Sequence, residues 1–146
     1  MPEAPSPNLR DFVMSRLASV REDLDEVLSK LDQEMMEWAP GEGMRTVAGQ
    51  LFEIAAMEVQ MLARVKEGRR LTDEDAKQRF GDCDSLENLK KVIVAVRGRT
   101  LDYLDSLGPD EFDKHMAIEW IAMHEYYHVG QLISYLWARG DNPYRW

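Results

Sequence analysis

Apolar residues recur at steps of three and four along four separate stretches, and this period constrains the fold more than any other feature. The stretches lie at about 7–38, 46–66, 85–107 and 113–139. In the first stretch the apolar positions are Phe12, Val13, Leu17, Val20, Leu24, Val27, Leu28, Leu31 and Met35. Such steps place side chains on one face of an α-helix. No stretch alternates every second residue, so we expect four helices and no sheet.

Glycine and proline follow each stretch and mark where each helix is expected to end. These residues are Pro40 and Gly41, Gly68, Gly108 and Pro109, and Gly140. At the other ends, Ser6-Pro7 suits the start of the first helix, with residues 1–6 as a loose tail. Asp84 or Ser85 is expected to cap the third helix.

Four amphipathic helices bury their apolar faces best as a bundle. The chain has 146 residues, the usual size of one domain, so we expect a single domain over 1–146. The link from Glu67 to Asp84 is long: fully extended it reaches roughly 60 Å, enough to return along a helix. We therefore predict an all-α, up-down-down-up bundle with a long crossover between its second and third helices. Thr72–Asp75 could start a short helix inside that link.

Charge and cysteine content exclude several classes of protein. Lys and Arg total 18 against 27 Asp and Glu, a formal net charge of -9. This charge repels phosphate backbones and anionic membranes, so we expect no nucleic acid and no membrane as partner. The N-terminus lacks the apolar run of a signal peptide. Cys83 is the only cysteine, which excludes an internal disulfide and a cysteine-based zinc site. We expect a cytoplasmic protein.

The stretch HEYYHVGQL, residues 124 to 132, carries two of the three histidines. His124 and His128 lie one helical turn apart, so both imidazoles can reach one cation. With Glu125 between them they match the zinc-protease pattern, but no histidine or glutamate follows to complete it. No strand is predicted to hold a peptide either. A metal site of another kind and a plain pair of hydrogen-bonded histidines both remain open.

A third ligand would have to come from earlier in the chain. His115 precedes His124 by nine residues, about 13 Å along a continuous helix, which is too far. Glu53 and Glu58 lie within the otherwise apolar run LFEIAAMEVQML. A buried carboxylate needs a cation or hydrogen-bond donors. An ion pair with an arginine is the ordinary solution, and the pattern alone does not choose.

Two segments resemble the DinB/YfiT-like superfamily of metal-binding four-helix proteins. They are HEYYHVGQLISYLWARGDNPY at the end of the chain and TVAGQLFEIAAMEV in the second helix. The resemblance implies the same bundle with a long crossover. Aligned on Thr46, the histidine ligand of the family falls on Glu53, and a later family glutamate falls on Glu58. The resemblance therefore favours Glu53, His124 and His128 as metal ligands, with Glu58 as a structural acid and the alternative ligand.

Two imidazoles and one carboxylate suit a divalent ion, Zn or Ni first and Fe or Mn next. Three protein ligands leave coordination positions open, as catalytic sites do. The resemblance implies a metal-dependent hydrolase, or a transferase joining a low-molecular-weight thiol cosubstrate to a small electrophile, and often a homodimer. The glutamate at position 53 equally allows a non-catalytic bundle that binds a small ligand or metal and has lost the full site. The sequence does not decide whether the protein is an enzyme.

Three further residues are candidates for catalytic roles. Gln131 and Tyr135 share the helix face of the two histidines, although tyrosine more often packs in a core there. Glu125 points toward the apolar face, where helix packing or support of a ligand is expected. Trp120, Tyr126, Tyr127 and Trp137 lie off the histidine strip, as a dimer surface or simply as rim.

Overall fold

The computed structural model describes residues 8–144, and in that range it contains helices and no strand. The predicted all-α class is therefore confirmed. The elements are α1 (Leu9–Leu28), η1 (Gln33–Met35), α2 (Val47–Glu67), α3 (Asp73–Gln78), α4 (Leu86–Asp105), α5 (Pro109–Lys114), η2 (Met116–Ile118) and α6 (Glu119–Ala138).

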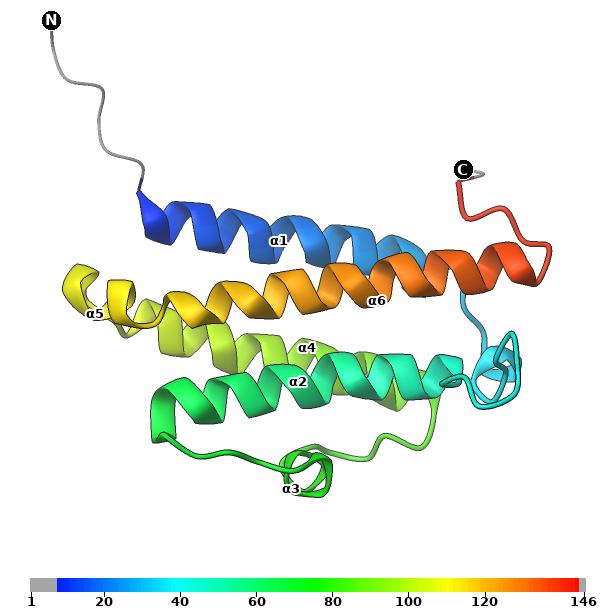
Figure 1. Cartoon of the computed structure of the whole chain (residues 1–146), viewed down its shortest axis with the longest axis horizontal. Helices are drawn as coiled ribbons and strands as arrows, with labels where there is room; N and C mark the ends of the chain where they lie inside the picture. Colours follow the sequence, from blue (N-terminus) through cyan, green and yellow to red (C-terminus); the bar gives the residue numbers. More distant parts are fainter. Residues whose placement is uncertain (1–7, 145–146) are drawn as a thin grey trace, which may run out of the picture.

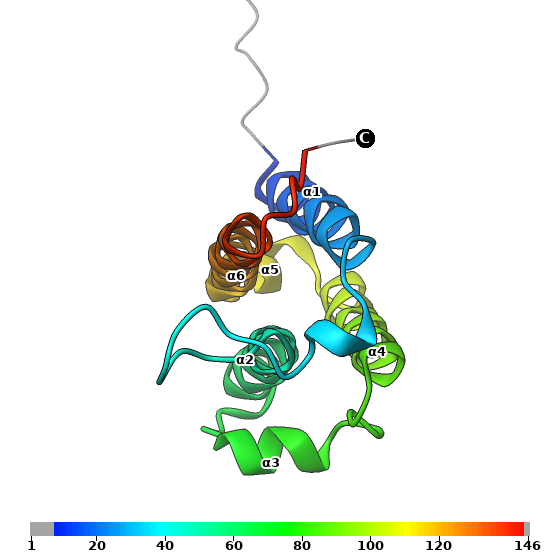
Figure 2. The same ribbon diagram turned by 90° about the vertical axis from the view of Figure 1, so that its right-hand side faces the viewer.

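The four long helices lie side by side along the length of the molecule (Figure 1). α6 packs against α1 on one side and α2 on the other, and α2 also packs against α4. The chain runs in the same direction in α1 and α6 and in the opposite direction in α2 and α4 (Figures 1 and 2). α2 and α6 are thus antiparallel neighbours, and residues near the start of α2 face residues near the end of α6.

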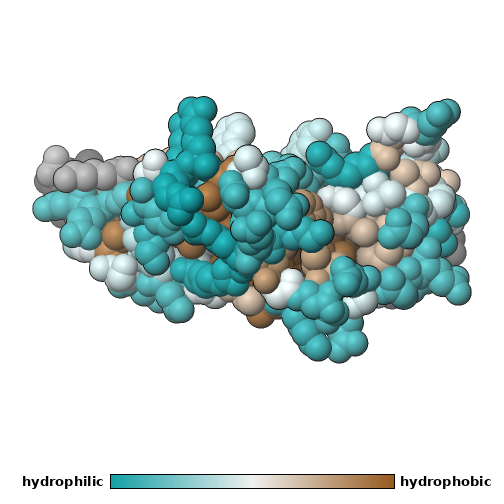
Figure 3. All heavy atoms as spheres, turned by 90° about the horizontal axis from the view of Figure 1, so that it is seen from below, coloured by the Kyte–Doolittle hydropathy of each residue, from teal (hydrophilic) through white to brown (hydrophobic). Residues whose placement is uncertain are grey.

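The segment between α2 and α4 carries the short helix α3, which packs against α2. The predicted helix start at Thr72 is present: its hydroxyl accepts from the Asp75 backbone N–H at 3.1 Å, and the Asp75 carboxylate accepts from the Thr72 N–H at 3.0 Å. This reciprocal pair is a capping box. The face that carries α3 is mostly hydrophilic, with smaller hydrophobic areas between the polar side chains (Figure 3).

One apolar core runs between the long helices. Leu17 and Leu24 of α1, Leu51 of α2, Ile93 of α4 and Leu132 of α6 are each at most 2% exposed. Leu17 and Leu24 belong to the three- and four-residue pattern of the first stretch, so the period identified the buried face of α1. Ser85 caps α4 through a hydrogen bond from the Asn88 N–H at 3.1 Å, one of the two caps expected.

The first helix is shorter than the predicted 7–38. α1 ends at Leu28, and Asp32 then caps the separate turn η1 by accepting from the Met35 N–H at 3.1 Å. Leu31 and Met35 are buried all the same. The apolar period therefore continued across a break that the local capping chemistry of Asp32 creates. The Ser6-Pro7 start and the 1–6 tail lie outside the described residues; Asn8 caps α1.

The last predicted helix, 113–139, is divided. α5 ends before His115, η2 follows, and α6 begins only at Glu119. Phe112 and Ile118, on either side of the break, are both buried. Both side chains therefore enter the core although the helix is interrupted at His115.

Candidate functional site

His124 and His128 face each other on α6. Their Nε2 atoms are 3.1 Å apart and their rings meet edge to face at 4.5 Å between centroids. His128 is buried, and His124 is partly exposed. The pair therefore forms one polar spot with an open side, as the four-residue spacing predicts.

A chain of hydrogen bonds across α2 and α6 fixes the tautomer of His128. Tyr135 donates its only hydroxyl hydrogen to the Arg45 carbonyl at 2.7 Å, so its oxygen accepts from the Gln50 amide Nε2 at 3.1 Å. The Gln50 carbonyl must then face His128, where Oε1 contacts Nδ1. That oxygen only accepts, so Nδ1 carries the hydrogen and Nε2 keeps a free lone pair toward His124.

The start of α2 is held firmly enough to support this chain. The Thr46 hydroxyl caps the helix by accepting from the Gly49 N–H at 3.0 Å. The N–H groups of Val47 and Ala48, which have no acceptor within the helix, donate to carbonyls in the segment around η1. Val47 donates to Trp38 O at 3.0 Å, and Ala48 donates to Met36 O at 2.9 Å. Gln50 and the Arg45 carbonyl are therefore positioned by backbone bonds.

Both imidazoles are held neutral near pH 7. Burial lowers the pKa of His128 to about 4, helped by the neighbouring His124 and by the positive charge of Arg45. Burial, and then Arg45, also lowers the pKa of His124. The Nε2 lone pair of His128 faces the Nε2 atom of His124. Either the neutral His124 carries its hydrogen on Nε2, or a cation lies between the two atoms, because two lone pairs would repel.

Gln131 lies one turn beyond His128 on the same side of α6. Its Oε1 atom is buried and has no hydrogen-bond partner of good geometry among the described residues. The Gln131 side chain raises the pKa of His128, but burial, His124 and Arg45 lower it by more. A buried carbonyl oxygen without a donor beside two imidazole nitrogens is a polar arrangement that a cation would satisfy.

Glu53, the predicted third ligand, is turned toward a different partner. Its carboxylate pairs with Arg45 at 3.8 Å, and its side chain is 22% exposed. Among the side chains that the structure describes, no three or more His, Cys, Asp or Glu are grouped so that they could hold a metal ion. The two histidines are thus brought together and Glu53 is not gathered with them, so the three-ligand set stays a prediction.

Glu58 and Glu125 belong to a buried ion-pair network. Arg97 of α4 donates to Glu58 at 2.7 Å and to Glu125 at 2.8 Å, and Arg21 of α1 donates to Glu125 at 3.0 Å. Burial by itself would lower the pKa of Arg97, but the two carboxylates raise it. Both carboxylates therefore pair with arginines: Glu58 links α2 to α4, and Glu125 links α6 to α1 and α4.

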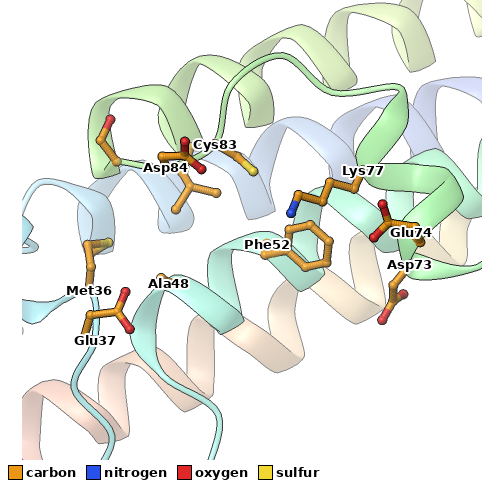
Figure 4. A pocket seen from close by; sticks show the side chains of 11 residues that line it. Met36, Glu37, Ala48, Phe52, Asp73, Glu74, Lys77, Cys83 and Asp84 are labelled. Atoms are coloured by element: carbon orange, nitrogen blue, oxygen red, sulfur yellow. The ribbon is translucent and has the colours of Figure 1, made fainter.

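His115 and Cys83 lie apart from the histidine pair. The His115 Nε2 atom is 3.3 Å from the Tyr103 hydroxyl of α4. Cys83 lines a separate pocket with Phe52, Lys77 and several acids, among them Asp84 (Figure 4). No histidine lines that pocket, and His115 contacts Tyr103, so the structure brings neither residue to the histidine pair.

Sequence reasoning missed Gln50, Arg45 and the two arginines of the ion-pair network. Gln50 could have been found: a buried amide in the apolar run of α2 needs a partner, and it lies on the face that meets the last helix. Arg21 and Arg97 lie far from Glu58 and Glu125 in sequence and carry no local signal.

The protein is all-helical and carries a histidine pair on its last long helix. Hydrogen bonds from the second long helix support this pair, and together these features define the class of protein. The family model of the DinB superfamily matches residues 16–132. The chain therefore belongs to the DinB superfamily. Comparison with curated proteins and with solved structures finds no match. Among residues 8–144, none of the helices is long and apolar enough to cross a membrane.

Proposed function

We propose that the protein is a four-helix, up-down-down-up member of the DinB superfamily that binds one divalent metal ion on His124, His128 and Glu53. Zn or Ni is the first choice and Fe or Mn the second. The observation that carries the proposal is the opposed pair of Nε2 atoms at 3.1 Å, with His128 held in the tautomer that leaves Nε2 free. The unpartnered Oε1 atom of Gln131 adds support.

The activity we propose is hydrolysis or thiol transfer on a small molecule. When bound, the ion would supply a positive charge that lowers the pKa of a water molecule or of a substrate thiol. Gln50 orients His128, and Tyr135 orients Gln50. The Tyr135 hydroxyl already donates its hydrogen bond to the Arg45 carbonyl, so Tyr135 is a positioning residue and not a proton donor to the substrate. Gln131 is the remaining candidate for contact with a substrate.

Glu53 becomes a ligand only by leaving Arg45. Both side chains are on the exposed side of the site, Arg45 at 48% and Glu53 at 22% exposure, and a surface ion pair is worth roughly 0–1 kcal/mol. A divalent ion is a far stronger partner for a carboxylate than one guanidinium. Replacing the Arg45 contact of Glu53 by a contact with the metal ion therefore costs little free energy.

The alternative is a non-catalytic bundle that binds a small ligand or metal. The Arg45–Glu53 pair favours it, because a guanidinium already neutralises the acid. A screen of low-molecular-weight thiols with electrophiles, and of ester and amide substrates, with and without added metal, separates the two. Metal-dependent turnover supports the enzyme, and none with a fully loaded site supports the binding protein.

Metal content tests the ligand set. Protein purified without chelator should carry about one ion per chain by elemental analysis. The double variant His124→Ala/His128→Ala should carry none, while the matched control His115→Ala should keep it. Retention of a full complement of metal by the double variant would refute these ligands. Thermal shifts with Zn, Ni, Mn and Fe(II) then rank the metals, since an ion that binds only the folded state raises Tm.

We further propose a cytoplasmic homodimer. Three large side chains on the outer side of α6 are exposed, Met123 at 45%, Tyr127 at 61% and Trp137 at 51%. An apolar stripe of this kind along one helix fits a second copy of the chain. Light scattering after size-exclusion chromatography should give twice the chain mass, and Tyr127→Lys should halve it.

A further inference from the structure

A groove lies between α2, the segment after α2, η2 and the start of α6. Its volume is about 710 Å³, within the usual range for small-molecule sites. The apolar residues that line it are Met57, Met61, Val65, Leu71, Ala117 and Trp120. Two methionines, a leucine and an indole form an adaptable surface for an alkyl or aromatic body.

The groove continues the strip that carries the candidate metal site. On α2, Met57 follows Glu53 by four residues. On α6, Trp120 precedes His124 by four and lines the groove, so it lies nearer the histidine strip than expected from the sequence. Residues four apart lie on the same face of a helix, about 6 Å apart along its axis. A molecule in the groove would therefore have one end next to the imidazoles.

The charge of the groove is opposite to that of the protein. Arg64 and Arg70 line it, and none of the described residues that line it is an Asp or Glu, in a chain of net charge -9. By contrast, the pocket beside Cys83 is lined by four acids. Every other arginine in the described range forms an ion pair or hydrogen bond within the protein; Arg64 and Arg70 form neither. Two unpaired guanidinium groups facing one apolar groove complement an anion.

We infer that this groove binds a small amphipathic carboxylate, with its apolar body on Met57, Met61 and Trp120 and its carboxylate between Arg64 and Arg70. Guanidinium groups hold a carboxylate through paired N–H···O bonds, and Arg64 and Arg70 are the two cations among the described residues of the lining. The inference deepens the proposed function by naming a substrate class. It rests on that function only for the claim that the bound molecule is the substrate.

Binding is tested with two probes that differ only in charge, 4-phenylbutyrate and 4-phenylbutyramide, by calorimetric titration of the full chain with chelator present. The carboxylate should bind about tenfold more tightly than the amide, the gain expected from charge-assisted hydrogen bonds. Arg64→Gln/Arg70→Gln should remove this difference. Arg69→Gln is the matched control, because Arg69 is next to Arg70 but pairs with Glu67 at 3.9 Å and does not line the groove. It should leave the difference unchanged.

Methyl resonances locate the bound molecule. On adding 4-phenylbutyrate, the Met57 and Met61 methyl signals should shift, while that of Met35, buried at η1, should not. Equal affinity for the two probes, an unaffected double arginine variant, or unshifted Met57 and Met61 would each overturn the inference. Since no metal is present in the titration, failure here leaves metal binding standing. Conversely, failure to load metal leaves this result intact.

Discussion

Arg97 of α4 donates to Glu125 of α6 at 2.8 Å, at a point where both side chains are almost wholly buried. The same guanidinium donates to Glu58 of α2 and to the Leu17 carbonyl of α1. One side chain therefore ties together all four long helices. Glu125 lies between the two histidines in sequence, so this tie also sets the rotation of α6 that turns His124 and His128 toward α2.

Removing Arg97 should destabilise the fold strongly. In Arg97→Met, Glu58 and Glu125 keep only Arg21, and breaking a buried pair costs about 3–5 kcal/mol. Urea denaturation followed by circular dichroism measures the free energy of unfolding. Arg99→Met is the control: Arg99 is exposed and bonds only to the Arg79 carbonyl, so it should change little. Equal stability of the two variants would show that the network is dispensable.

The apolar period predicted the helical class and the buried faces, because burial repeats with the turn of the helix. It could not predict the break after Leu28 or the separate α5, because Leu31 and Phe112 are buried whether or not the helix is continuous. The four-residue spacing of His124 and His128 predicted that their side chains lie close together, because both are on one helix. The partners of Glu53 and Glu58 depend on side chains from other segments, which no local pattern encodes.

Gln50 should control metal affinity through His128. In Gln50→Leu the Nδ1 hydrogen loses its acceptor, and loss of such a support costs about 10–100-fold in metal affinity. Gln50→Glu restores an acceptor for Nδ1 and should recover the affinity. Competition with a chromogenic chelator measures both. Equal weakening by Leu and Glu would show that Gln50 acts through packing and not through the imidazole.

The metal-free protein should lose stability as the pH falls from about 6.5 to about 4. The pKa of His128 is lowered to about 4 in the folded state, so within that window the unfolded chain binds the extra proton and acid favours unfolding. Integrated over this shift, the loss is about 3 kcal/mol. Above the unfolded pKa of about 6.5, His128 is neutral in the folded and unfolded states, so this loss of stability is absent. His128→Gln should flatten this part of the profile, measured by urea denaturation at each pH with chelator present.

The role of Glu53 can be isolated through its competition with Arg45. Arg45→Ala frees the carboxylate and removes a positive charge that disfavours a cation near the histidines, so metal affinity should rise, by about fivefold. Only the backbone carbonyl of Arg45 bonds to Tyr135, so that support survives the substitution.

Glu53→Gln should lower the affinity by about tenfold or more if Glu53 is a ligand. In the double variant, the gain from Arg45→Ala should then shrink, because there is no longer a carboxylate to release. The coupling between the two changes measures the competition directly. Additive effects, with the same gain in the presence and absence of Glu53, would mean that Arg45 acts only through its charge and that the third ligand lies elsewhere.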